Sequence, residues 1–291
     1  QADLGIEVTI ALFCKEGLEN LFKSIEEKQL NKTAPLLLSE NSARILALKE
    51  VYVKTIDQVI SFLQGKSNTL AHLICTRNFL PEASRFEQLD NLNWAFGSMG
   101  KQDMAKHIAT MYLEDLSDLI KENIDEHFGF SRYAESLGRS ANSFDDLYNA
   151  LQNPFTYLDE ILIKILDVRL KEVNPKLVCL SVPFPGNLYT SLRCAQWIKQ
   201  HYPGTKVAMG GGFANTELRS LSDVRVFEFY DFITLDDGEA PLEILIEHLD
   251  GKKQQHELKR CFTLVNGVVT YINNKNCSDY KQGQVGKPDY D

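Results

Sequence analysis

Ser181-Val-Pro-Phe-Pro-Gly-Asn187 decides how the second half of this chain is interpreted, together with two clusters of similar character, Gly210-Gly-Gly-Phe213 and Asp236-Asp-Gly-Glu239. Each cluster directly follows a short apolar run: Leu177–Leu180, Lys206–Met209 and Phe232–Leu235, respectively. Apolar runs of this length bounded by turn residues are typical of buried strands. Because loops at the carboxyl ends of parallel strands line the ligand crevice of an open α/β sheet, we expect the three clusters to meet at one edge.

Helical patterns separate these runs. Asn187–His201 is an amphipathic helix that ends before Pro203-Gly204, and Glu239–Leu249 is a second helix, closed by Gly251. A shorter helix or turn is expected near Thr216–Ser222. The alternation of strands and helices predicts the α/β class with a doubly wound parallel sheet. Three parallel strands are few for such a sheet, so we expect others from the start of the chain or from polypeptide before Gln1.

The chain divides into three expected regions. Residues 1–173 are mostly helical by pattern, with apolar positions at helical spacing over Ile6–Ile25, Ser42–Leu63, Met104–Ile124 and Phe155–Val173. Residues 174–256 form the α/β domain, which makes the helical region a large insertion. Residues 257–291 begin with a hairpin over Asn266-Gly267, the strongest short hairpin signal, and continue as a polar linker.

Composition excludes several classes of function. The chain has 291 residues, 44% of them hydrophobic, and a formal net charge of −9, which disfavours binding to nucleic acid or to an anionic membrane. It contains neither a run of about 18 apolar residues nor a signal-peptide pattern. Its six cysteines are scattered, which is typical of a reduced, cytoplasmic protein. The histidines His72, His107 and His127 share no metal-ligand spacing, so no metal site is expected.

The loop clusters match no common catalytic motif. Gly210-Gly-Gly212 lacks the Gly-x-Gly-x-x-Gly fingerprint of dinucleotide sites, because Asn215 occupies the third glycine position, and the chain has no P-loop. Ser181 lacks the Gly-x-Ser-x-Gly elbow of a nucleophile. Asp236-Asp-Gly-Glu239 does not follow calcium-loop spacing and is better explained as the start of a helix, where acidic residues are favourable. We expect no catalytic acid, base or nucleophile among these residues.

These same residues resemble the cobalamin-binding (B12-binding) domain that precedes the barrel in many bacterial radical SAM enzymes. Leu180-Ser-Val182 resembles the serine motif of that family's third strand. Met209–Gly212 resembles its Gly-Gly turn, and Asp236–Leu242 its Gly-Glu helix entry. The resemblance covers roughly Lys176–Gly251, and Gln1–Leu4 resembles the end of the second strand.

The resemblance implies a B12-binding, flavodoxin-like or Rossmann-like fold and a cobalamin cofactor. It implies contacts from Ser181, Pro183, Phe184, Gly210, Gly211, Gly212, Phe213, Asp237, Gly238 and Glu239. It also implies a separate radical SAM barrel, the chain's partner, whose [4Fe-4S] cluster cleaves S-adenosylmethionine for a methyltransferase-like or rearrangement reaction. This chain contains no Cys-x-x-x-Cys-x-x-Cys for that cluster and no Asp-x-His-x-x-Gly motif for a lower cobalt ligand.

Two other classes of function stay open at this point. One is a non-catalytic scaffold that no longer binds cobalamin and uses its helices to bind a partner or substrate. The other is a stand-alone small-molecule enzyme with a flavodoxin-like fold, which would need a convergent acid–base pair that the sequence does not reveal.

Overall fold

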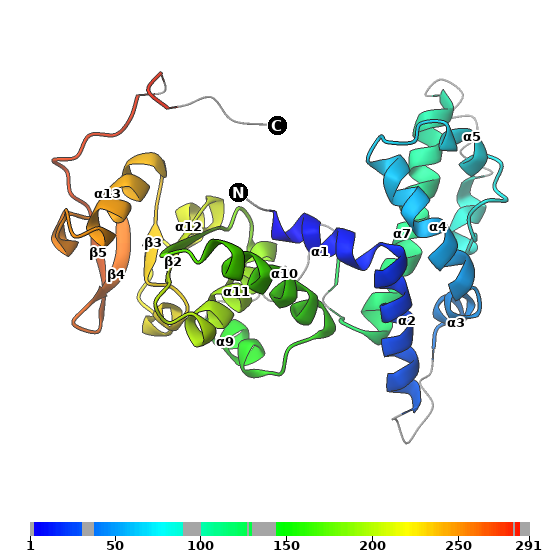
Figure 1. The fold of residues 1–291 in the computed structure, drawn as a ribbon, viewed down its shortest axis with the longest axis horizontal. Coiled ribbons are helices and arrows are strands. Elements are labelled where there is room, and N and C mark those ends of the chain that lie inside the picture. The colour runs from blue at the N-terminus through cyan, green and yellow to red at the C-terminus, as the bar shows by residue number, and fades with distance from the viewer. Residues whose placement is uncertain are drawn as a thin grey trace. The chain divides into compact units, whose positions relative to one another are not determined.

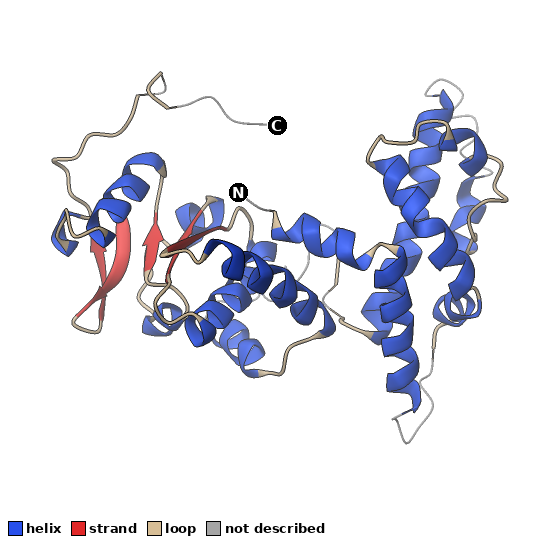
Figure 2. Ribbon diagram, in the orientation of Figure 1, coloured by secondary structure: helices blue, strands red, loops and turns tan. Residues whose placement is uncertain are grey.

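The computed structural model describes residues 3–30, 38–89, 100–126, 128–129, 144–281 and 283–285. Two compact units make up the chain, and we describe each by itself (Figure 1). The first comprises Gln1–Tyr133 and Phe155–Ile165, and the second comprises Ala134–Pro154 and Leu166–Asp291. Among the described residues, strands occur only in the second unit (Figure 2).

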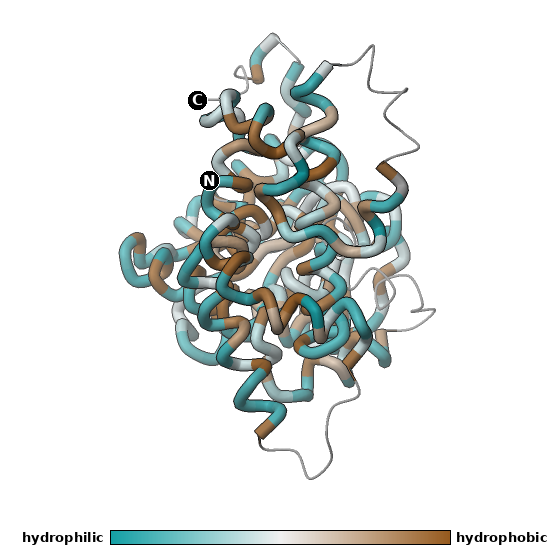
Figure 3. The backbone as a smooth tube through the Cα atoms, turned by 90° about the vertical axis from the view of Figure 1, so that its right-hand side faces the viewer, coloured by the Kyte–Doolittle hydropathy of each residue, from teal (hydrophilic) through white to brown (hydrophobic). Residues whose placement is uncertain are grey.

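The first unit is helical. Its elements in chain order are α1 (Leu4–Leu12), α2 (Lys15–Leu30), α3 (Glu40–Ala47), α4 (Lys49–Leu63), α5 (Leu70–Ile74), the 3₁₀ helix η1 (Ser84–Gln88), α7 (Gly100–Asn123) and the start of α10 (Tyr157–Val173). The long helix α7 packs against α3, α4 and α5, and α2 packs against α4. Along these helices apolar and hydrophilic positions alternate (Figure 3), and many of the apolar side chains pack into one buried cluster.

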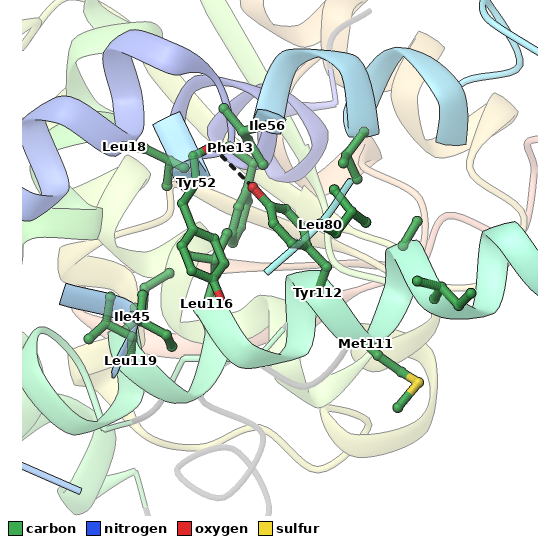
Figure 4. Packing of buried hydrophobic residues seen from close by; sticks show 14 of the residues in the cluster. Phe13, Leu18, Ile45, Tyr52, Ile56, Leu80, Met111, Tyr112, Leu116 and Leu119 are labelled. Atoms are coloured by element: carbon green, nitrogen blue, oxygen red, sulfur yellow. Dashed lines mark hydrogen bonds between the residues drawn. The ribbon is translucent and has the colours of Figure 1, made fainter. Parts of the chain in front are cut away.

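The interior of this unit centres on two tyrosines (Figure 4). The rings of Tyr52 on α4 and Tyr112 on α7 stack with their centroids 5.0 Å apart, and the Tyr112 hydroxyl donates to the Tyr52 carbonyl at 3.1 Å. Burial raises the pKa of Tyr52 to about 12. Nearby, the fully buried Asp115 accepts from Arg44 at 3.2 Å and from Arg85 at 2.6 Å. The buried carboxylate is therefore paired, as a charge away from water must be.

The sequence pattern over Ile6–Ile25 predicts one helical face, and the structure corrects this. The chain leaves the helix at Phe13 and Cys14, and α2 starts in a new direction. Gly17 allows the bend, because a Cβ there would lie 2.1 Å from the carbonyl oxygen of Ala11. Ile6, on α1, is therefore 57% exposed instead of sharing the buried face of α2. Leu4 already belongs to α1, so it ends no strand, and Gln1 and Ala2 lie outside the described residues, as does His127.

The second unit contains the sheet. Its elements are α9 (Asp145–Gln152), the end of α10, β1 (Leu177–Ser181), η2 (Pro185–Asn187), α11 (Leu188–His201), β2 (Lys206–Gly210), α12 (Gly212–Glu217), η3 (Val224–Glu228), β3 (Phe232–Thr234), α13 (Glu239–Leu249), η4 (Gln255–Glu257), β4 (Cys261–Val265) and β5 (Val268–Ile272). The three parallel strands and both long helices lie within one or two residues of the bounds that the sequence pattern predicts. No sequence pattern predicts α9.

The described strands form a mixed five-stranded sheet in the order β1-β2-β3-β4-β5. β1, β2 and β3 are parallel, with Ser181 opposite Gly210 and Ala208 opposite Phe232. The fold is therefore of the α/β class with a mixed sheet. The strand order follows the chain, so the reversal of strand order that defines a doubly wound sheet is not seen within the described residues. Helix α13 covers the face that carries Ala208, Phe232 and Cys261.

The expected hairpin is present and extends the sheet. β4 runs antiparallel to β3, with Cys261 opposite Thr234, and β5 runs antiparallel to β4. Asn266 and Gly267 have φ of +52° and +79°, the left-handed pair that a tight two-residue hairpin turn requires. The hairpin, expected with the linker in residues 257–291, is thus hydrogen-bonded into the α/β unit.

Helix α9 is held to α11 by a buried arginine. Arg193 is 1% exposed and donates to the carbonyl oxygens of Ala150, Leu151 and Asn153 at 2.7–3.1 Å. These carbonyls lie at the C-terminal end of α9, where a helix lacks partners for its last carbonyls, and the guanidinium supplies donors from outside the helix.

Candidate functional site

The three loop clusters meet at one edge of the sheet. Parallel strands end on the same side, and direct hydrogen bonds join the first two loops: the Val182 N–H donates to the Gly210 carbonyl at 2.8 Å, and the Phe213 N–H donates to the Val182 carbonyl at 3.0 Å. We call the loops Ser181–Asn187, Gly210–Phe213 and Leu235–Glu239 the strand-end rim. The structure therefore brings the sequence-selected residues together.

The two central glycines of the rim are required by packing. Gly211 has φ of +101° and ψ of −179°, a combination that only glycine readily adopts. A Cβ on Gly211 would lie 2.7 Å from the carbonyl oxygen of Val182, and one on Gly212 would lie 2.8 Å from that of Pro183. The glycine pattern favours a close approach by a ligand, which stays a prediction. The missing side chains also let the second loop lie directly on the first.

The third loop is fastened to the second. Asp236 has φ of +61°, and its N–H donates to the side-chain oxygen of Asn215 at 2.7 Å. Its carboxylate pairs with Arg219, which follows α12. The Thr234 hydroxyl, at the end of β3, donates to the Met209 carbonyl at 3.4 Å. Backbone hydrogen bonds thus join the first two loops, and side-chain contacts join the third loop to the neighbouring chain.

The outer surface of the rim presents an aromatic ring and a hydroxyl. Phe184 is 70% exposed, which is unusual for a phenylalanine, and Ser181 and Pro183 on the same loop are also exposed. Phe213, expected to form a wall of the site, is only 6% exposed, so it supports the loop from beneath.

The third rim loop, Leu235–Glu239, contributes acidic side chains to the surface of the rim. Asp237, Gly238 and Glu239 are all exposed, and Glu239 opens α13, where a carboxylate interacts favourably with the helix dipole. No atom lies within 4 Å of the Cβ direction of Gly238, unlike that of Gly211. Gly238 therefore has open space beside it that is available to another molecule.

The histidines of the two helices that begin at the rim lie far from it. Helices α11 and α13 begin at the rim, and their histidines, His201 and His248, lie in the last turns, about 20 Å and 14 Å along the helix axes at 1.5 Å per residue. Within the described ranges, no three His, Cys, Asp or Glu side chains converge as a metal site requires. Chemically, the rim is suited to holding a broad molecule by apolar contact and hydrogen bonds.

Two residues that bind the rim together carry no functional signal in the sequence. Asn215 stands out there only because it breaks a glycine motif. Arg260 precedes β4 and donates to the Asp237 carbonyl at 2.9 Å and to the Leu235 carbonyl at 3.3 Å. No local pattern marks Arg260, since its role depends on the antiparallel pairing of β4 with β3.

Comparison of the chain with family models, curated proteins and solved structures found no significant match. In the described part of the chain, no helix combines the length and the apolar content that crossing a bilayer requires.

Proposed function

We propose that the α/β unit is the cobalamin-binding front domain of a radical SAM enzyme. The observation that carries the proposal is Phe184, a phenylalanine 70% exposed beside the exposed Ser181 at the carboxyl ends of parallel strands. This is the position at which open α/β sheets bind their ligands. An exposed aromatic ring favours a ligand with a broad flat face, because stacking removes apolar surface of both from water.

The rim fits a corrinoid in its donor set. Ser181 supplies a hydroxyl for the polar periphery, Phe184 and Pro183 supply an apolar wall, and Gly210–Gly212 supply backbone supported by Phe213. Asp237 and Glu239 flank the open space at Gly238 and accept hydrogen bonds from amide groups of the kind that surround a corrin. When bound, cobalamin supplies radical or alkyl-transfer chemistry.

The remaining parts of the proposal concern polypeptide beyond the rim. The parallel strands β1–β3 belong to a doubly wound sheet that further strands complete. A radical SAM barrel, with its [4Fe-4S] cluster and S-adenosylmethionine, covers the other face of the cofactor and carries the reaction in the cytoplasm. The helical unit is an insertion into the cofactor domain.

The test is direct binding of hydroxocobalamin. The purified chain is mixed with the compound, and the dissociation constant is measured by equilibrium dialysis with detection of its visible absorption. We expect Phe184→Ala and Ser181→Ala each to weaken binding by about tenfold, the usual scale for one well-placed contact. Both side chains are exposed, so neither change threatens the fold.

Val268→Ala is the matched control. Val268 is 64% exposed and lies beside the hairpin turn, at the end of the sheet opposite the rim, so its truncation should leave binding unchanged. Failure of the unaltered chain to bind hydroxocobalamin, or equal losses in all three variants, overturns the proposal. The first of these outcomes favours a scaffold that has lost the cofactor.

A further inference from the structure

Arg260 lies between the third rim loop and the segment that follows the hairpin. Its backbone carbonyl accepts from the Leu235 N–H at 2.9 Å, continuing the pairing of β4 with β3. Its side chain, 12% exposed, turns back over the rim and donates to the carbonyls of Leu235 and Asp237. One residue thus contacts the loop through both its backbone and its guanidinium.

The other side of the guanidinium is occupied by Asp279. Arg260 Nη1 donates to one carboxylate oxygen of Asp279 at 2.9 Å, and Nη2 lies 2.7 Å from the other. This two-point pairing fixes the plane of the guanidinium, which a single contact does not. Hydrogen bonding from Arg260 also lowers the pKa of Asp279, so the aspartate is charged at neutral pH.

The segment that carries Asp279 is itself attached at several points. The Asn274 N–H donates to the Leu258 carbonyl at 2.9 Å, buried Lys259 donates to the Cys277 carbonyl, and the Tyr280 hydroxyl donates to Glu243 on α13. All of these contacts are made by side chains or single backbone groups, and none continues the sheet. Lys259 also lies 3.4 Å from a carboxylate oxygen of Asp279. We call the segment Asn274–Tyr280 the strap, because it lies against the sheet without being one of its strands.

We infer that Arg260 is a positioning residue for the rim and that the strap Asn274–Tyr280 controls it through Asp279. With the strap in place, Asp279 orients the guanidinium, and the guanidinium holds the Leu235 and Asp237 carbonyls and so the start of α13. When the strap moves away, Arg260 loses its two-point partner, and the loop Leu235–Glu239 loosens. The consequence for cofactor binding rests on the proposed function, whereas the coupling itself does not.

Hydrogen exchange of the complete chain, measured by mass spectrometry, tests the coupling without any ligand. We expect Asp279→Asn to speed exchange in peptides covering Leu235–Leu242 by about tenfold, because an uncharged amide cannot reproduce the paired bonds. Asp279→Glu keeps the carboxylate and should restore most of the protection. Arg260→Lys keeps the positive charge but removes the planar guanidinium and its paired donors, so it should speed exchange as much as Asp279→Asn does.

Asp250→Asn is the matched control. Asp250 is 42% exposed against 46% for Asp279, and it also pairs with a basic side chain, Lys252 at 3.2 Å. Removing the charge of Asp250 should leave hydrogen exchange in Leu235–Leu242 unchanged. If Asp279→Asn loosens only the strap and leaves Leu235–Leu242 as protected as before, the coupling is refuted.

A second measurement separates this inference from the proposed function. If the unaltered chain binds hydroxocobalamin, Asp279→Asn should weaken binding several-fold while Asp250→Asn does not. If it does not bind, the proposed function fails, and the exchange experiment still decides whether the strap governs the loop.

Discussion

Replacing Gly211 by alanine tests the central claim about the rim, that this glycine serves packing between two loops. The backbone of Gly211 has φ of +101° and ψ of −179°, and an added Cβ would lie 2.7–2.9 Å from the backbone oxygen, nitrogen and carbon of Val182. None of these atoms belongs to a flexible side chain that can move aside. Alanine must therefore strain its own backbone and also separate the two loops.

The size of the effect follows from these two causes. Residues held in such a backbone region cost about 1–3 kcal/mol. Forcing extra atoms into a packed contact costs about 1–3 kcal/mol more. We expect Gly211→Ala to lower the free energy of unfolding of the α/β unit by about 3 kcal/mol, which at a urea slope near 2 kcal/mol/M lowers the midpoint by about 1.5 M.

The assay follows the α/β unit alone. The chain has two tryptophans, and in a Trp94→Phe background the fluorescence of Trp197 on α11 reports urea unfolding of this unit. Gly238→Ala is the control, because Gly238 has φ of −78° and open space around its Cβ direction. It should be neutral or stabilising by about 0.5 kcal/mol. Equal midpoints for Gly211→Ala and Gly238→Ala would refute the packing argument.

Three further predictions concern positions away from the rim. Arg193→Lys removes donors that the buried guanidinium gives to the carbonyls at the end of α9, and it should destabilise the α/β unit by about 2–4 kcal/mol in the same urea assay, whereas an unchanged midpoint would exclude a capping role. Gly17→Ala forces a Cβ onto the Ala11 carbonyl and should lower the melting temperature of the helical unit by several degrees, measured by circular dichroism. Hydrogen bonds from Lys171, Tyr202 and Trp197 lower the pKa of Asp167 from 3.8 to about 2. Because the folded pKa lies below the unfolded one, this stabilisation is complete above pH 4 and disappears as the pH falls toward 2, so the unaltered chain should lose its stability advantage over Asp167→Asn across that interval.

Most secondary structure of the α/β unit follows from sequence pattern. The apolar runs before Ser181, Gly210 and Asp236 form β1, β2 and β3, and Asn266-Gly267 forms the hairpin turn. These signals are local: a strand needs a short apolar run, and a tight turn needs residues that accept positive φ.

The helical unit is less well predicted, since helical spacing alone does not show where a helix bends. The pattern over Ile6–Ile25 runs across the boundary between α1 and α2. The bend depends on contact between Gly17 and the carbonyl of Ala11, which apolar spacing does not encode. No local pattern predicts helix α9, whose terminal carbonyls are held by Arg193, about forty residues later in the chain.

The sequence by itself determined that three small or polar clusters end three buried strands, and that these clusters share one edge, because parallel strands end on the same side. Only the tertiary structure decided what each glycine does: the Cβ direction of Gly211 is filled by Val182, whereas that of Gly238 is open. It also decided that Arg260 contacts the rim and that Asp279 pairs with Arg260. The physical reason is that strands and turns arise from residues that are neighbours in the sequence. Packing and ion pairs join residues that are far apart in the sequence, and no sequence pattern marks which of them will meet.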